Sequence, residues 1–307
     1  MPNGRPRICV VGSSNIDLTF RTPRLPRPGE TLSGQAFQLG YGGKGANQAV
    51  MAARLGGQVT MIGRVGRDVF GEGMIRNFCE HGIDTTHVRF DEERPSGVAS
   101  IVVDDAGQNC IIVAAGANAA LSPADIQEAS SAIQAADVVL CQLEVPLETV
   151  IEAFRLGRSA RTILNPAPAQ PLPSELLRLT NVCVPNETEL ELLMEQKVAT
   201  LQDAERAARS LLGRGPETIV VTAGARGALI VDSAKAELIP APPVKAIDTT
   251  GAGDAFIGSL AVFLAEGASL VEAVRRANFA AALSVTRLGT QTSFPTRAEI
   301  ETALAPG

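Results

Sequence analysis

Short apolar runs rich in β-branched residues alternate with longer stretches of helical periodicity along almost the whole chain. The periodicity predicts buried strands over residues 8–11, 59–62, 138–141, 162–164, 182–184 and 218–222. It predicts helices between them, over residues 44–55, 70–81, 123–135, 147–155 and 201–212. This alternation is typical of a parallel sheet covered by helices on both faces. We therefore expect a three-layer α/β fold with a central, mostly parallel sheet.

Helix start signals support this pattern. Ser122 and Pro123 with Asp125 are typical of a helix N-terminus, and Thr296 with Glu299 has the spacing of a capping box.

The segments 18–39 and 98–114 interrupt the alternation. The first contains Pro23, Pro26 and Pro28 and is too rich in proline for a helix. In the second, residues 98–103 and 109–114 flank the turn sequence Asp-Asp-Ala-Gly, which indicates a β-hairpin. Antiparallel strands of this kind either form a lid that keeps water from a reacting group or only extend the sheet. The prediction is one α/β domain over residues 1–307 with a discontinuous β lid formed by about 16–42 and 95–116.

The composition disfavours several classes of function. The 307 residues are 45% hydrophobic with a mean hydropathy of +0.14, which indicates a well-filled core. Aromatic residues make up only 4%, the net charge is −6, and no block of Lys and Arg is present, so no nucleic-acid partner is expected. No apolar run has the length of a membrane span or a signal peptide. We expect a soluble, cytoplasmic protein with no membrane partner.

The cysteines and histidines suggest neither a disulfide framework nor a zinc site. The two histidines, His81 and His87, lack a partner at helical ligand spacing. The five cysteines form an odd, scattered set without a C-x-x-C pair, as expected in a reducing compartment: Cys9, Cys79, Cys110, Cys141 and Cys183. Acid–base chemistry is therefore expected from carboxylates.

The run Asp-Thr-Thr-Gly-Ala-Gly-Asp at 248–254 directly precedes an apolar stretch at 255–264, which predicts a helix start. Gly251, Ala252 and Gly253 would present free N–H groups and the positive end of the helix dipole to an anion. Asp254 would lie beside that anion, where it could take a proton from a hydroxyl that attacks phosphorus. The alternative is a glycine-rich helix start in which Asp254 only complements the dipole.

A second glycine-rich run, Gly-Tyr-Gly-Gly-Lys-Gly at 40–45, matches the pattern G-x-G-x-x-G. A dinucleotide site is disfavoured because the run follows an irregular segment and the next strand has no acid at its end. A Walker A loop is excluded because Gly45 follows Lys44. The remaining interpretation is a helix start at which Lys44, Asn47 and backbone amides hold a polyhydroxylated substrate. The alternative is a tight turn with a solvated Lys44.

Further polar residues follow other predicted strands. Asn15 and Asp17 are two apart and would face one side of an extended chain, unless they form a turn. Glu144 follows the strand at 138–141 and is either a site residue or a helix-start acid. Open α/β sheets bind ligands at the carboxyl ends of their strands, so these side chains are candidates for one site.

Two clusters in the second half of the chain suit a nucleotide. Asn186 and Glu189 follow the strand at 182–184, where one carboxylate beside a triphosphate is enough for Mg²⁺. An N-cap with first-turn acids is the alternative. The run Thr-Ala-Gly-Ala-Arg-Gly at 222–227 either holds phosphates or forms a tight hairpin.

Two of these runs, 42–49 and 248–256, resemble the signatures of the ribokinase-like family, the carbohydrate kinases of the PfkB type. Segments 28–31, 63–71, 116–118 and 186–189 also fit, so the resemblance extends from residue 8 to about residue 300. The runs Gly-Gly-Lys-Gly-Ala-Asn-Gln and Pro-Gly-Glu-Thr are more similar to the ribokinases of the family than to its fructokinases, adenosine kinases or phosphofructokinases. The resemblance implies ATP-dependent phosphorylation of D-ribose at its 5-hydroxyl.

The resemblance also implies roles for individual residues. Asp254 would be the general base beside an anion hole at Gly251, Ala252 and Gly253. The sugar would be held by Asn15, Asp17, Gly43, Lys44, Asn47, Glu144 and Asp254, with Ile111 contacting it from the lid. The nucleotide would be contacted by Asn186, Thr222, Ala223, Gly224, Ala225, Arg226, Gly227, Gly253 and Asn278, the last replacing a His of some ribokinases.

Cations and a partner subunit follow from the same resemblance. Glu189 would act through the Mg²⁺ shell. A monovalent cation, usually K⁺, would lie beside the anion hole and be held, partly through backbone oxygens, by Asp248, Thr250, Ser284, Arg287, Gly289 and Ser293. The lids of this family commonly pair, which implies a homodimer.

Other functions remain open. A kinase of the same fold for deoxyribose, fructose or a nucleoside would differ only in its pocket. A non-catalytic sugar- or nucleotide-binding regulator is disfavoured because Asp254 and the glycines are intact. A nicotinamide oxidoreductase is disfavoured because the acid that binds a ribose is missing.

Overall fold

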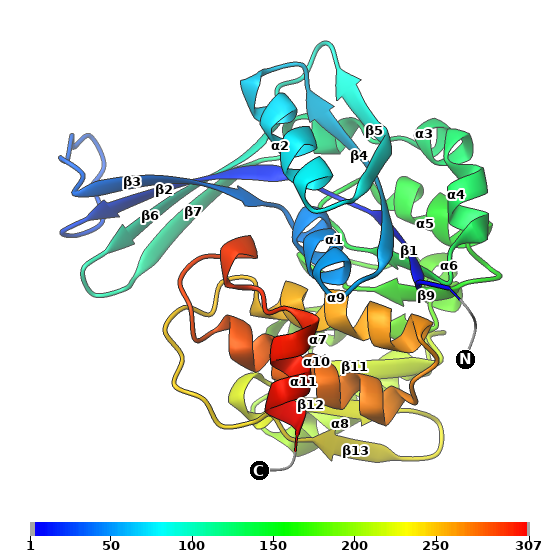
Figure 1. The fold of residues 1–307 in the computed structure, drawn as a ribbon. Helices are drawn as coiled ribbons and strands as arrows, with labels where there is room; N and C mark the ends of the chain where they lie inside the picture. The colour runs from blue at the N-terminus through cyan, green and yellow to red at the C-terminus, as the bar shows by residue number, and fades with distance from the viewer. Residues whose placement is uncertain (1–3, 306–307) are drawn as a thin grey trace.

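The computed structural model describes residues 4–305, and within them the strands form two separate sheets (Figure 1). The main sheet has nine strands in the order β13-β12-β11-β10-β9-β8-β1-β4-β5. The strands from β11 to β5 in this order are parallel, and β12 and β13 continue the sheet antiparallel at one edge. The strands are β1 Arg7–Val11, β4 Gln58–Gly66, β5 Asp84–Asp91, β8 Val138–Cys141, β9 Arg161–Leu164, β10 Val182–Cys183, β11 Thr218–Thr222, β12 Ala228–Val231 and β13 Ala236–Ile239.

Helices cover both faces of this sheet, which confirms the predicted three-layer α/β fold. One face carries α1 Lys44–Arg54, α2 Val69–Glu80, α9 Ala252–Ala265, α10 Leu270–Ser284 and α11 Arg297–Leu304. The other carries α3 Pro123–Glu128, α4 Ser130–Ala135, α5 Leu147–Leu156, α6 Ser174–Arg178, α7 Glu187–Met194 and α8 Leu201–Leu212.

Strand β1 shows how the chain fills both cores. Its residues alternate, so that Ile8 and Val10 face the core with α1 and α9, whereas Cys9 and Val11 face the opposite core. Because helices cover both faces, this strand is apolar throughout, as parallel strands usually are. A continuous apolar run was therefore the right signal for a central strand.

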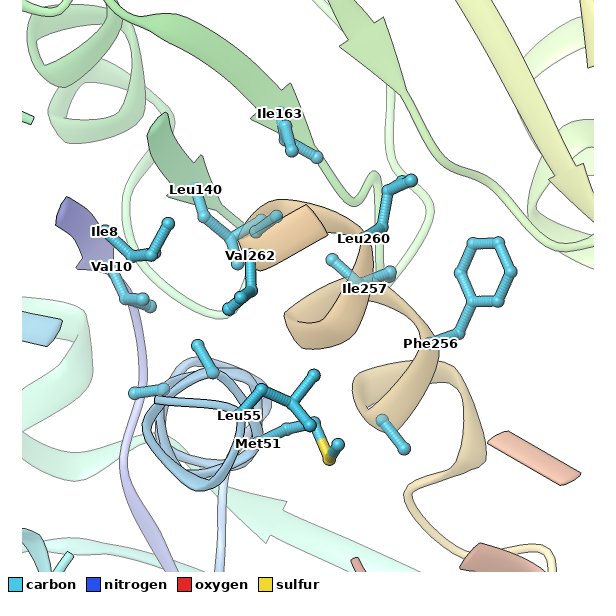
Figure 2. Packing of buried hydrophobic residues seen from close by; sticks show 14 of the residues in the cluster. Ile8, Val10, Met51, Leu55, Leu140, Ile163, Phe256, Ile257, Leu260 and Val262 are labelled. Carbon is cyan, nitrogen blue, oxygen red and sulfur yellow. The ribbon is translucent and has the colours of Figure 1, made fainter. Parts of the chain in front are cut away.

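The core between the sheet and helices α1 and α9 is shown in Figure 2. Met51 of α1 and Leu55, which caps its carboxyl end, lie against α9, whose Leu260 packs in the same cluster as Leu140 of the sheet. All four side chains are fully buried, and each such burial stabilises the fold by roughly 1.5–3 kcal/mol. Helix α9 is buried on all sides from Asp254 to Leu264, so its amino end is fixed in position by the core.

Most predicted elements have the expected bounds to within a few residues. The helix predicted over 123–135 is the exception, because it is divided into α3 and α4 at Ala129. No Gly or Pro marks this break, so the sequence gives no sign of it. Both predicted caps are present: Ser122 with Asp125 caps α3, and Thr296 with Glu299 caps α11.

The second sheet projects from the body of the molecule (Figure 1). It consists of β2 Asn15–Thr22, β3 Ala36–Gly42, β6 Gly97–Asp104 and β7 Asn109–Ala114, in the order β3-β2-β6-β7. The predicted hairpin is confirmed, because β6 and β7 pair antiparallel around the turn at Gly107, whose φ is 78°. Strands β2 and β3 also pair antiparallel, whereas β2 and β6 join the two hairpins in parallel.

All five cysteines are free. Cys9, Cys141 and Cys183 are buried in strands, and burial raises the pKa of the Cys9 thiol to about 12. Cys79 and Cys110 are exposed. Among residues 4–305, no helix combines the length and the apolar character needed to cross a membrane.

Candidate active site

The amino end of α9 has the geometry expected of an anion site. Gly251 is the N-cap with a φ of 75°, and Asp254 follows in the first turn. A Cβ at Gly251 would lie 2.5 Å from Cγ2 of Thr290, so both the backbone and the space require glycine there. A Cβ at Gly253 would meet nothing within 4 Å, so the space before this turn is open. The Ala252 N–H makes only a long bond, 3.3 Å, to the carbonyl oxygen of Thr249.

The Asp254 carboxylate is held by two side-chain amides of α1. Asn47 Nδ2 donates to Oδ2 at 2.9 Å, and Gln48 Nε2 donates to Oδ1 at 2.9 Å. Burial raises the pKa of Asp254, and the charge of Glu144 adds to this rise. Lys44 and the two amides act in the opposite direction but do not cancel it. Asp254 is thus more than a dipole partner, because it is buried among polar groups from other elements.

Two glycines allow α1 to reach this position. A Cβ at Gly258 of α9 would lie 2.6 Å from the carbonyl oxygen of Gln48, so the two helices touch through backbone. A Cβ at Gly45 would lie 2.7 Å from the backbone nitrogen of Ser13, in the turn after β1. The first turn of α1 is therefore fixed between α9 and β1, with Asn47 and Gln48 facing Asp254.

Glu144 belongs to the same cluster. Helix α5 begins only at Leu147, so Glu144 is not a helix-start acid. Its Oε2 accepts from the backbone N–H of Lys44 at 3.0 Å and from the Ser13 hydroxyl. Burial by itself lowers the pKa of the Lys44 ammonium, but the carboxylates of Asp254, Glu144 and Glu189 raise it above its ordinary value. Lys44 is therefore held charged among these acids, unlike the solvated side chain of the alternative interpretation.

Asn15 and Asp17 lie in β2 and pair with β3, so they form a strand and not a turn. Both occupy one face of the small sheet, as their spacing predicted. Asn118, in the 3₁₀ turn η1 (Gly116–Ala120), donates to Oδ1 of Asn15 at 2.8 Å. A Cβ at Gly42, which pairs with Asn15 across the two strands, would lie 2.3 Å from Oδ2 of Asp17, so a side chain there would displace this carboxylate.

Asp17 has a perturbed acidity. Burial raises the pKa of its carboxyl to about 6, and the charges of Glu144 and Asp254 contribute to the rise. Ile111 of β7 lies on the Asp17 face of the sheet, because Thr19, Ile101 and Ile111 are cross-strand neighbours. Its side chain is 52% exposed.

Two of the predicted nucleotide segments, the one at Asn186 and the run that begins at Thr222, meet at the ends of β10 and β11. Asn186 caps α7, and its side chain and that of Glu189 form a reciprocal capping box. The capping alternative is therefore present, yet burial raises the pKa of Glu189, and the charges of Lys44 and Asp254 also reach it. Asn186 forms an isolated parallel bridge with Thr222, which brings the two predicted segments together.

The 222–227 run forms the connection between the antiparallel strands β11 and β12, as the hairpin alternative stated. It contains the 3₁₀ turn η2 (Gly224–Arg226), and Arg226 forms an ion pair with Glu187. Asn278 is buried in α10, where its Nδ2 donates to the carbonyl oxygen of Ile239 at 2.9 Å. The donor side of its amide is thus engaged by backbone.

The residues predicted to hold a monovalent cation lie on two adjoining loops. Asp248 accepts from the backbone N–H and hydroxyl of Thr250 at 3.0 and 2.7 Å, and from the Gly289 N–H at 2.9 Å. The hydroxyls of Ser284 and Ser293 donate to their own helical turns, and Arg287 pairs with Glu299. Backbone oxygens from both loops and the carboxylate of Asp248 remain the donor types that suit a hard cation. Across residues 4–305, no group of three or more His, Cys, Asp or Glu is arranged to hold a metal ion.

Sequence reasoning missed several residues of this site. Ser13, Gln48, Asn118, Gln142 and Gln291 are buried polar residues that bond directly to predicted ones or to each other. A signal existed for Gln48, which directly follows Asn47 in the glycine-rich run. Gln142 directly follows the predicted strand at 138–141, as Glu144 nearly does, so its place in the sequence was a signal, whereas Gln291 stands in loop sequence and had none.

The chain is similar to known proteins over nearly its whole length. The model of the pfkB family of carbohydrate kinases matches residues 5–297. The chain is 43% identical to a ribokinase of Haemophilus influenzae over 96% of its length and 97% of the relative's, and 43% identical to a deoxyribokinase of Salmonella typhi over 94% and 95%. It is similar to the structure of Arabidopsis thaliana ribokinase complexed with ribose and ATP, with a TM-score of 0.92, 32% identity and coverage of 99% and 100%.

Proposed function

The chain belongs to the pfkB family of carbohydrate kinases, and from this premise we propose that it is a ribokinase. It transfers the terminal phosphoryl group of ATP to O5 of D-ribose and releases D-ribose 5-phosphate and ADP. The observation that carries the proposal is the Asp254 carboxylate, buried between two amides at the amino end of α9. The full-length likeness to a ribokinase complexed with ribose and ATP supports the choice of both substrates.

Asp254 is the proposed general base. A sugar hydroxyl is too weak an acid to be ionised in advance, and in a loose phosphoryl-transfer transition state its proton leaves late. Asp254 therefore orients O5 and accepts its proton as the new P–O bond forms. Each oxygen of the carboxylate accepts one amide hydrogen and keeps further lone pairs for the substrate. The N–H groups of Gly251, Ala252 and Gly253 stabilise charge on the transferred group.

We propose that the remaining sugar hydroxyls bind the acids, amides and backbone around Lys44. The set is Asn15, Asp17, Gly43, Lys44, Asn47 and Glu144. It combines acceptors and donors, which a polyhydroxylated ligand needs, since each hydroxyl both donates and accepts. Gly43 has a φ of 88°, and a Cβ there would lie 2.8 Å from the backbone nitrogen of Asn15, so glycine is required where these two backbone segments pack together.

The nucleotide is proposed to lie across the ends of β10 and β11. Its contacts would be Asn186, the loop from Thr222 to Gly227, Gly253 and Asn278. Glu189 faces the same cluster and would hold Mg²⁺ through water, and bound Mg²⁺ supplies neutralisation of phosphate charge. Oxygens of Asp248, Thr250, Ser284, Arg287, Gly289 and Ser293 would hold K⁺ next to the anion hole.

The small sheet is proposed to act as a lid over the sugar and as the contact of a homodimer. Its two faces differ in character. Asn15, Asp17 and Ile111 share one face, and the opposite face carries the cross-strand pairs Leu18 with Leu39 and Phe20 with Phe37. Phe37 is 58% exposed and Ile112, on the same face, 69%. An exposed apolar face of this kind is typical of a contact surface.

The lid residues, about 16–42 and 95–116, are discontinuous in sequence, and we propose that the rest of the chain forms one domain with them.

The free state of all five cysteines supports a reducing, cytoplasmic location.

A deoxyribokinase is the second candidate, because the chain is as similar to that of Salmonella typhi as to the ribokinase of Haemophilus influenzae, at 43% identity in each case. The two substrates differ only at the 2-hydroxyl. ATP consumption with ribose, deoxyribose, fructose and adenosine, with and without KCl, separates these functions and tests the proposed cation. A kcat/KM higher for deoxyribose than for ribose would replace the first proposal by the second.

The Asp254→Asn variant tests the catalytic mechanism. Removing a general base typically costs about 10²–10⁴-fold, so we expect kcat to fall by that factor while ATP still binds, as measured by calorimetry. Asp232→Asn, at an exposed turn after β12, is the control and should keep wild-type turnover. Turnover of Asp254→Asn within about tenfold of wild type would refute the role of Asp254.

A further inference from the structure

A chain of buried amides leads from Gln142 to the base. Gln142 is the residue directly after β8 and is fully buried. Its Nε2 donates to Oε1 of Gln48 at 2.6 Å, and Gln48 Nε2 donates to Oδ1 of Asp254 at 2.9 Å. Gln142 therefore acts on the carboxylate through Gln48, without touching it.

A second chain reaches the other oxygen of the carboxylate. Asn77 of α2 donates through Nδ2 to Oε1 of Gln291 at 2.9 Å. Gln291, in the 3₁₀ turn η3 (Gln291–Ser293), donates through Nε2 to Oδ1 of Asn47 at 3.0 Å. Asn47 Nδ2 then donates to Oδ2 of Asp254 at 2.9 Å. All three amides are buried.

In both series of hydrogen bonds, each amide NH₂ group donates toward Asp254. An ionised carboxylate only accepts hydrogen bonds, so Asn47 and Gln48 must turn their NH₂ groups toward Asp254. Their carbonyl oxygens then face away and need donors, which Gln291 and Gln142 provide. Reversing any one of these amides end for end would bring two oxygens or two NH₂ groups together. The direction of the whole network is therefore set by the charge on Asp254, and the network in turn favours that charge.

At the Gln142 end of this network, one buried polar atom is left without a hydrogen bond in the described part of the chain, which destabilises the fold. Oε1 of Gln142 is a buried side-chain oxygen without a hydrogen-bond partner among residues 4–305. It lies directly over Gly12, where a Cβ would be 2.0 Å away. Reversing the Gln142 amide would turn this oxygen toward Oε1 of Gln48, which would then have no donor. The unpartnered oxygen is retained because the NH₂ group is needed at Gln48.

We propose that Gln142 is a positioning residue for catalysis, which fixes the Gln48 amide and through it the direction and ionisation of the Asp254 carboxylate. Gln291 has the matching role through Asn47. This inference rests on the proposed function, in which Asp254 is the general base.

Charged groups around Asp254 also affect its titration. Lys44 of α1 favours the ionised form, whereas Glu144 after β8, Asp17 of β2 and Glu189 of α7 oppose it. None of these groups changes in a variant of Gln142. A shift in the titration of Asp254 in such a variant therefore reports on the amide chain.

Gln142→Met is the test, because Met has a similar length and no donor. Without this partner the carbonyl oxygen of Gln48 has no donor, and the Gln48 amide is held only through Nε2, which donates to Asp254 and, at 3.2 Å, to Oδ1 of Asn165. We expect kcat for ribose to fall about tenfold and the acidic limb of its pH profile to move up by about one pH unit, the size expected for one hydrogen bond to a charged group. The profile is measured at saturating ribose, so that titration of Asp17 in the free enzyme does not enter.

Two further variants make the result specific. Thr149→Val in α5 removes another fully buried hydrogen bond, 2.7 Å from the hydroxyl to the carbonyl oxygen of Leu121, and should leave the acidic limb unchanged. In Gln142→Glu the introduced carboxyl is buried, so it is expected to stay protonated near neutral pH and to donate to Gln48 through its O–H. This variant should keep the wild-type acidic limb and lose turnover at higher pH as the introduced carboxyl ionises.

The outcomes separate the two levels of inference. If Gln142→Met shows an unchanged acidic limb, or the same shift as Thr149→Val, the positioning role is wrong while the proposed function stands. Should Gln142→Met not fold, an acidic limb in Gln142→Glu that moves, or turnover that stays flat at higher pH, overturns the role. If Asp254→Asn itself retains turnover, both the proposed function and this inference fail.

Discussion

At the scale of single residues, the site is a cluster of acids around one ammonium group. Asp17, Glu144, Glu189 and Asp254 are all within electrostatic reach of one another or of Lys44. Burial raises the pKa of Asp17, Glu189 and Asp254, because fewer water molecules stabilise their charge. The charge of the proposed sugar site therefore depends on pH, most directly at Asp17, whose pKa is about 6.

Asp17 gives a test at this scale. Its pKa is raised to about 6, so its carboxylate accepts hydrogen bonds from sugar hydroxyls at about pH 7 and is mostly protonated at about pH 5. If only the ionised form binds, the Kd for ribose should rise about tenfold between these two pH values, as measured by calorimetry. Asp17→Asn should bind more weakly and lose this pH dependence; an unchanged pH dependence in that variant would exclude Asp17 as its source.

The raised pKa of Asp17 also makes the stability of the folded state depend on pH. A carboxyl whose pKa is raised on folding binds its proton more tightly in the folded state than in the unfolded one. The contribution of Asp17 to stability is therefore fully present below its ordinary pKa of 3.8 and is lost as the pH rises through about 6. Sugar binding and folding thus have opposite pH preferences at this residue.

At the scale of elements, the position of the proposed base, Asp254, depends on how closely two helices approach. Helix α9 carries Asp254, and α1 carries the amides that hold it, so the distance between the helices sets the geometry of the carboxylate. The contact occurs at Gly258, one turn after Asp254. A side chain there would meet backbone, which cannot rotate away as a flexible side chain does.

Gly258→Ala should therefore change both stability and turnover. The added Cβ would lie 2.6 Å from the carbonyl oxygen of Gln48, so the helices must separate. We expect a loss of about 1–3 kcal/mol in the free energy of unfolding, typical of overpacking. We also expect a lower kcat for the folded enzyme, because the amides of α1 move away from Asp254. Urea denaturation and steady-state kinetics measure the two effects.

Gly213→Ala is the matched control for this change. Gly213 follows α8 with a φ of −62°, and its nearest neighbour to a new Cβ would be 3.5 Å away, an ordinary contact. It should be as stable as the wild type or slightly more so, since Ala restricts the unfolded chain. Equal stability of the two variants would show that the helix contact tolerates a methyl group.

At the scale of the whole molecule, one small sheet is proposed to serve two partners. The face with Asp17 and Ile111 would contact the sugar. The opposite face, with Phe37 and Ile112, would contact a second copy of the chain. Because side chains alternate along a strand, neighbouring residues 111 and 112 belong to different functions. A dimer that holds the sheet in place would couple assembly to sugar binding.

Ile112→Asp and Ile111→Asp form a matched pair for this proposal. Sedimentation velocity should show a dimer for the wild type and for Ile111→Asp, and a monomer for Ile112→Asp, because a buried carboxylate at the contact is costly. Ile111→Asp should instead raise KM for ribose. A monomeric wild type, or an Ile112→Asp protein that remains dimeric, would contradict the proposed contact.

The sequence by itself determined the layers of this protein and the main parts of its site. Continuous apolar strands and amphipathic helices follow from local patterns, and a glycine-rich helix start with Asp254 is readable because its parts are adjacent in the chain. Local patterns also predicted the hairpin of β6 and β7 and the shared face of Asn15 and Asp17.

Only the tertiary structure decided how these parts act on one another. Gln142, Gln48 and Asp254 are far apart in sequence, and nothing local marks a buried glutamine as a partner of a distant acid. The parallel pairing of β2 with β6 likewise joins two hairpins from separate segments. Local periodicity records which residues are buried, whereas the partner of a buried polar group depends on packing between distant elements. The carboxylate's orientation is therefore a property of the folded chain.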